Sequence, residues 1–72
     1  MMKHTFSEEI FADEYGRPRG KGIWIFGDRN KHMTVTIGSQ DEPLDYRKAR
    51  KLAAIEFEQR RFPIYKTIYL HP

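Results

Sequence analysis

The residues best suited to chemistry form a short basic stretch, Gly-Arg-Pro-Arg-Gly-Lys-Gly, at positions 16–22. Arg17, Arg19 and Lys21 place three cations among residues that let a backbone approach a ligand closely, which is typical of phosphate binding. The stretch lacks the GxxxxGK[ST] pattern, so it is not a P-loop. An ordinary charged hairpin turn would explain the same composition.

Aromatic side chains form a second candidate site, because successive residues of a strand point to opposite faces. Three strand-like segments, at 22–26, 33–37 and 63–70, show such alternation. One face would carry the aliphatic residues Ile23, Ile25, Val35, Ile37, Ile64, Ile68 and Leu70. The other face would carry Trp24, Phe26, Thr34, Thr36, Tyr65, Thr67 and Tyr69. A small domain has one core, so the aromatic face needs a separate explanation.

Three explanations of the aromatic face remain open. Aromatic rings on an open sheet beside basic residues are suited to stacking on the bases of a single strand. The face could instead form a homodimer interface or dock on a larger protein, since Tyr, Trp and Arg are typical interface anchors. It could also be covered within the chain by Phe6, Ile10 and Phe11, if that segment is a helix.

The remaining reactive side chains do not form a catalytic pattern. The chain has no cysteine, which excludes a thiol nucleophile, a thiolate metal site and a disulfide framework. His4, His32 and His71 lie far apart and have no ligand spacing to one another or to a carboxylate. Ser7 and Ser39 lack a neighbouring base. We therefore expect a non-enzymatic protein with no catalytic residue, no metal and no cofactor.

One helix is predicted at Leu44–Arg61, which is rich in good helix formers and has no internal Gly or Pro. Its N-terminus could be capped by Ser39, Asp41 or Asp45, and Pro63 would stop it. The apolar stripe consists of Tyr46, Ala49, Leu52, Ala53 and Phe57. The basic residues Arg47, Arg50 and Lys51 fall beside or opposite this stripe.

The elements together predict an α+β fold in a single domain spanning residues 1–72. The order is β-β-β-α-β, with an antiparallel sheet of three or four strands and one amphipathic helix on its aliphatic face. The first element, at 5–15, is ambiguous between a strand and a helix ended by Gly16, and we favour the strand because it would shield a sheet edge.

Size and charge narrow the classes of function. The longest apolar run, Ile23–Phe26, is far shorter than the roughly 20 residues that cross a bilayer, so we expect a cytoplasmic protein with no membrane association. The net charge is +3, and the bases concentrate in two blocks. Residues 17–32 hold five bases and one acid, and residues 46–72 hold seven bases and two acids. If both blocks share a surface, that surface would attract phosphate or an acidic partner.

The sequence therefore predicts a small basic binding module, and nucleic acid is the expected partner. In size, charge and compactness the chain resembles small accessory proteins of phages and mobile elements. Phosphate contacts are expected from Arg17, Arg19 and Lys21, extended by Arg47, Arg50 and Lys51, with ring contacts from Trp24, Phe26, Tyr65 and Tyr69. The alternative is a protein-interaction module or inhibitor that docks on a larger partner through the aromatic sheet face.

Overall fold

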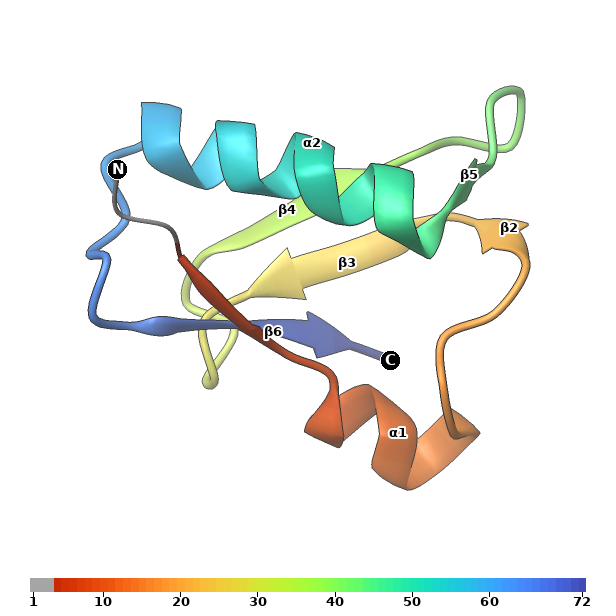
Figure 1. The fold of residues 1–72 in the computed structure, drawn as a ribbon, viewed down its shortest axis with the longest axis horizontal. Helices are drawn as coiled ribbons and strands as arrows, with labels where there is room; N and C mark the ends of the chain where they lie inside the picture. The colour runs from red at the N-terminus through yellow and green to blue at the C-terminus, as the bar shows by residue number, and fades with distance from the viewer. Residues whose placement is uncertain (1–3) are drawn as a thin grey trace.

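A four-stranded sheet and a long helix organise the chain in a computed structural model that describes residues 4–72. The elements are β1 (Thr5–Ser7), α1 (Glu9–Tyr15), β2 (Lys21–Gly22), β3 (Trp24–Gly27), β4 (Thr34–Ile37), β5 (Leu44–Asp45), α2 (Tyr46–Gln59) and β6 (Thr67–His71). The α+β class is confirmed. Figure 1 shows α2 along one side of the sheet and the short α1 beyond β6 on the opposite side.

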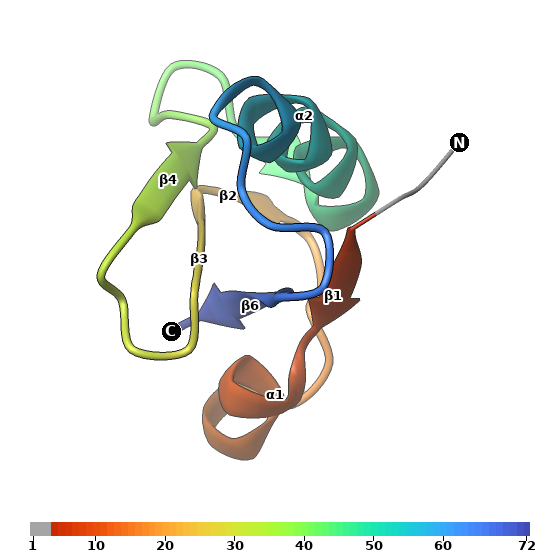
Figure 2. The ribbon, with the colours of Figure 1, turned by 90° about the vertical axis from the view of Figure 1, so that its left-hand side faces the viewer.

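The main sheet has the strand order β1-β6-β3-β4, and β2 pairs with β5 in a separate two-stranded ladder. β3 is antiparallel to β4 and to β6, as expected, but β1 runs parallel to β6 and makes the sheet mixed. This pair joins opposite ends of the chain, with Thr5 opposite Thr67, so no hairpin links the two strands. The sheet curves around α2, with β4 on one flank and β1 on the other (Figure 2).

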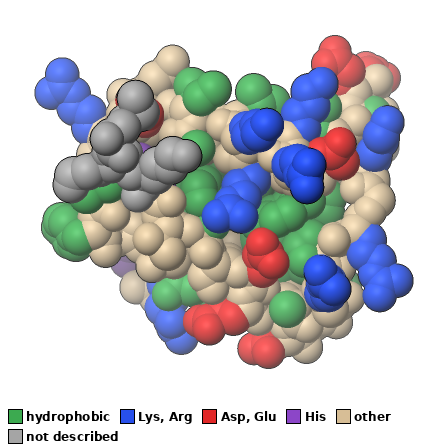
Figure 3. Space-filling view, viewed as in Figure 1, with side chains coloured by type: hydrophobic (Ala, Val, Ile, Leu, Met, Phe, Trp, Pro, Cys, Tyr) green, Lys and Arg blue, Asp and Glu red, His purple; other side chains and the backbone are tan. Residues whose placement is uncertain are grey.

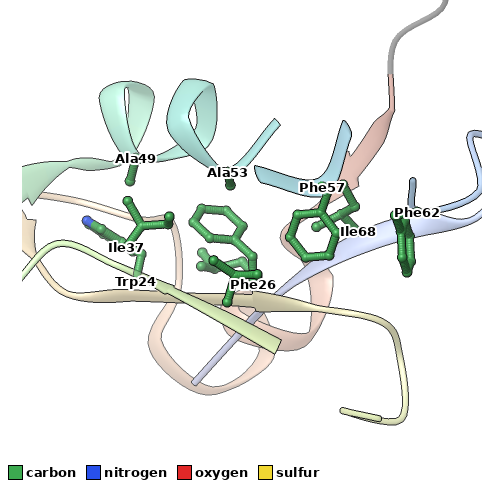
Figure 4. Packing of buried hydrophobic residues seen from close by; sticks show 10 residues of the cluster. Trp24, Phe26, Ile37, Ala49, Ala53, Phe57, Phe62 and Ile68 are labelled. Carbon is green, nitrogen blue, oxygen red and sulfur yellow. The ribbon is translucent and has the colours of Figure 1, made fainter. Parts of the chain in front are cut away.

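The expected division into an aliphatic core face and an exposed aromatic face is wrong for β3. Trp24 is 5% exposed and Phe26 is 0% exposed, whereas Ile23 is 49% exposed. β4 and β6 follow the prediction, since their aliphatic residues are buried and their threonines face away from the core. Figure 4 shows the two aromatic rings of β3 beneath α2.

The strand register explains why β3 is inverted. Trp24 lies opposite Ile37, and Phe26 lies opposite both Val35 and Leu70. Directly opposed residues in a sheet point to the same face, so the aromatic side chains of β3 join the aliphatic side chains of its neighbours. Both faces of β3 are apolar, and a strand of that kind does not reveal from its own sequence which face is buried.

α2 begins two residues later and ends two residues earlier than predicted. Leu44 belongs to β5, and Asp45 is the N-cap, whose Oδ1 accepts a 2.8 Å hydrogen bond from the backbone N–H of Lys48. Ala49, Ala53 and Phe57 are buried against the sheet, as the stripe predicted (Figure 4). Leu52, which was predicted on the same stripe, is 40% exposed.

The N-terminal segment contains both alternatives in succession. Thr5–Ser7 is a strand, but Glu9–Tyr15 is a helix, so the preference for a strand is wrong for those residues. Gly16 ends the helix at φ 79°, and its N–H donates to the carbonyl of Ala12. Two aromatic side chains of this segment reach the core: Phe6 lies 5.8 Å from Phe26 and Phe11 lies 5.9 Å from Trp24, centroid to centroid. Phe6 and Phe11 therefore cover part of the aromatic side chains of β3 from within the chain, which is one of the three explanations that the sequence left open.

The last predicted strand, 63–70, is shorter at its start and longer by one residue at its end. Lys66 donates its N–H to the carbonyl of Pro63, which forms a turn that contains Tyr65. β6 follows from Thr67 to His71. Across residues 4–72, no helix has the length and apolar character required to cross a membrane.

Candidate functional site

The β2–β5 ladder brings the basic stretch beside the start of α2. Lys21 pairs with Asp45 and Gly22 pairs with Leu44 in antiparallel register. The indole Nε1 of Trp24 donates a 2.7 Å hydrogen bond to the carbonyl oxygen of Leu44, which fixes this ladder to the core. The loop that carries Arg17 and Arg19 is therefore held next to the N-terminus of α2.

A hollow of about 390 Å³ lies at this junction. It is lined by Pro18, Arg19, Gly20, Asp45, Tyr46 and Arg47. Arg19 and Arg47 come from the two separate basic blocks of the sequence, and the fold places both at the same hollow. The two basic blocks therefore meet at these two residues, an arrangement that the sequence had left open.

The six predicted phosphate-binding residues are all exposed: Arg17, Arg19, Lys21, Arg47, Arg50 and Lys51. None of them forms an ion pair with a carboxylate of the described chain. Arg29 and Arg60, by contrast, lie 3.6 Å from Glu9 and Glu56, respectively. The six residues therefore have their positive charge available for an external anion.

Three basic residues of α2, Arg47, Arg50 and Lys51, lie on one flank of the helix, because their positions are spaced by three and four residues. The guanidinium of Arg50 lies 4.9 Å from the centroid of the Phe6 ring, a cation–π contact that directs this side chain toward β1. Figure 3 shows basic side chains over α2 and others beside the loop before β2, with hydrophobic surface between them.

Two side chains at the hollow, Asp45 and Tyr46, do not add positive charge for binding an anion. Asp45 is an acid, but its carboxylate caps α2, where the helix dipole offsets part of the negative charge. Burial raises the pKa of the Tyr46 phenol well above its ordinary value, and the negative charge of Glu8 raises it further. Tyr46 is therefore protonated at neutral pH and adds no charge.

The four predicted ring contacts do not come together. Trp24 and Phe26 are core residues, with no ring face open to a ligand. Tyr69 is half-buried on the sheet face away from α2, because its neighbours in β6, Ile68 and Leu70, are in the core. Tyr65 is 84% exposed in the turn before β6. The expected aromatic sheet surface is absent.

The structure shows a second hollow, of about 210 Å³, that the sequence did not predict. It is lined by Asp28, Arg29, Asn30, Lys66, Thr67 and Tyr69. The Arg29 guanidinium donates to the Tyr69 hydroxyl at 3.2 Å and lies 5.5 Å from the centre of that ring. His71 is 3% exposed, and its Nε2 lies 2.8 Å from the carbonyl oxygen of Asp28. These contacts join residues some 40 positions apart, and no local sequence signal marks them.

Metal-ligating groups do not cluster in the described structure: residues 4–72 contain no set of three His, Asp or Glu side chains that could hold a metal ion. Comparisons of the chain with models of protein families, with curated proteins and with solved structures gave no match. A proposal about function therefore has to be argued from the basic surface and its surroundings.

Proposed function

We propose that this protein binds nucleic acid by contacting its phosphates with the surface formed by the 16–20 loop, β2 and the basic flank of α2. The observation that carries the proposal is the convergence of Arg19 and Arg47 on one hollow, within a set of exposed cations that have no carboxylate partner among residues 4–72. Such cations gain affinity by releasing the counterions condensed on a phosphate backbone.

The alternative, docking on a protein through an aromatic sheet face, has less support because of the burial of the aromatic residues. It required Trp24 and Phe26 to be exposed, and both rings are buried under α2. A surface of unpaired cations around a shallow hollow suits a polyanion better than it suits an apolar protein interface.

The test is fluorescence anisotropy with labelled single-stranded and duplex oligonucleotides over a series of salt concentrations. The parent protein should bind at low salt and lose affinity linearly in a plot of log K against log salt. The double variant Arg19→Gln/Arg47→Gln should bind more weakly and have a flatter salt slope. Absence of binding at low salt, or binding that salt does not weaken, contradicts the proposal.

A matched control separates this surface from general positive charge. Arg29→Gln/Lys66→Gln also removes two positive charges, but at the second hollow. Because Thr67 and Tyr69 of that hollow lie on the sheet face away from α2, this variant should retain most of the affinity and most of the salt slope. Equal losses in both double variants would mean that the protein attracts nucleic acid only through its net charge.

A further inference from the structure

Tyr15 is an exposed aromatic residue that is not part of the hydrophobic core. It closes α1 and is 62% exposed. Its ring lies 5.0 Å from that of Phe11, centroid to centroid, and Phe11 in turn lies 5.9 Å from Trp24. The phenol makes no hydrogen bond within residues 4–72. Tyr15 thus contacts the core through Phe11, while one side of its ring remains open to solvent.

The aromatic row continues from this exposed ring to the basic hollow. Trp24 lies 5.4 Å from Tyr46, and Tyr46 lines the hollow with Arg19 and Arg47. An exposed ring therefore stands at one end of a row of ring-to-ring contacts, and a cationic hollow stands at the other.

The chain also connects Tyr15 directly to the phosphate-binding loop. Gly16, at φ 79°, turns the backbone at the end of α1, and its N–H is held by the carbonyl of Ala12 at 2.9 Å. Arg17 follows at once. Of the acids of α1, Asp13 lies about 200° from Tyr15 around the helix, and Glu14, the preceding residue, lies about 100° from it.

We propose that Tyr15 stacks on an unpaired base of a single-stranded nucleic acid whose phosphates lie on Arg17, Arg19 and Arg47. This inference rests on the proposed function and adds the substrate class to it. A ring that binds a base needs that base to be unstacked, which a single strand permits and a closed duplex does not. Tyr15 then supplies the preference for single strands, and the cations supply affinity for either form.

The experiment compares Tyr15→Leu and Tyr15→Phe with a matched control, Tyr65→Leu. Tyr65 is more exposed, at 84%, but lies in the turn between α2 and β6, at the opposite end of α2 from the loop (Figure 1), and contacts no other aromatic ring in the described chain. The ligands are a labelled oligothymidine and a blunt duplex of the same number of phosphates. Circular dichroism and thermal melting establish that each variant is folded.

Tyr15→Leu should weaken binding to oligothymidine by roughly 5- to 150-fold, the range for loss of one base–aromatic stack, and should leave duplex binding unchanged. Tyr15→Phe should retain the parent affinity because it keeps the ring, and Tyr65→Leu should match the parent. Oligothymidine binding that is equal in Tyr15→Leu and the parent overturns the stacking proposal while leaving phosphate binding intact. No binding of either ligand at low salt overturns the proposed function itself.

Discussion

Trp24 and Leu44 are joined by a 2.7 Å hydrogen bond from the indole Nε1 to the backbone carbonyl oxygen. Leu44 directly precedes Asp45, the N-cap of α2, so this bond ties β3 to the start of the helix. The same junction carries the hollow lined by Arg19 and Arg47. A core side chain therefore fixes the strand end that borders this surface hollow.

Replacing Trp24 with Phe should destabilise the protein by about 1–3 kcal/mol, because the Leu44 carbonyl loses its partner in a partly buried position. The smaller ring also leaves space in the core, which adds to the loss. Urea unfolding followed by circular dichroism measures the change. Tyr65→Phe, which removes one polar atom from an exposed ring, serves as the control and should change stability by less than about 0.5 kcal/mol. Equal stability of Trp24→Phe and the parent would contradict the role of this bond.

The two alanines of α2 test how closely the helix approaches the sheet. Ala53 is 0% exposed and points at the ring of Phe26 in Figure 4, so Ala53→Leu should cost about 1–3 kcal/mol through overpacking. Ala54→Leu makes the same chemical change one residue later, at a half-buried position, and should be close to neutral. The measurement is the melting temperature of each variant. Similar melting temperatures for the two variants would show that the interface can expand.

Local patterns predicted the elements of this fold better than they predicted which faces are buried. The helix stripe identified Ala49, Ala53 and Phe57 correctly because helical periodicity is carried within one segment. The faces of β3 depend on its register with β4 and β6, which is a long-range property. The parallel pairing of β1 with β6 depends on both ends of the chain and has no local signal either.

The candidate site shows the same limit. Arg19 and Arg47 were both predicted as phosphate contacts from composition and spacing, but their meeting at one hollow depends on the short β2–β5 ladder. Tyr15 was not predicted as a ring contact, because alternation in strands identifies only aromatic residues of strands and Tyr15 is in a helix.

Asp28 should make stability depend on acid pH. The backbone N–H of Met33, 3.0 Å from Oδ1, holds the pKa of this carboxyl below its usual 3.8, and the charge of His32 acts in the same direction. Because the pKa is lower in the folded state than in the unfolded state, the stabilisation is present above about pH 4 and is lost as the pH falls through the folded value.

Melting temperatures measured from pH 7 down to pH 2 test this expectation. The parent should lose more stability over the acid range than Asp28→Asn, which keeps an oxygen acceptor for the Met33 N–H but cannot be protonated there. The two curves should therefore converge at the acid end. Parallel curves over the whole range would show that the ionised carboxylate of Asp28 contributes nothing specific.

Placement of charge, rather than its total, should govern binding to a phosphate backbone. Arg19→Gln and Arg61→Gln each lower the net charge by one, but Arg19 lines the hollow at the start of α2 and Arg61 follows the opposite end of that helix. Arg19→Gln should weaken binding and reduce the slope of log K against log salt by about 1. Arg61→Gln should leave the slope nearly unchanged, because α2 holds it about 20 Å away, at 1.5 Å per residue over 14 residues. Identical slopes for the two variants in anisotropy titrations would show that the anion is not held at the hollow.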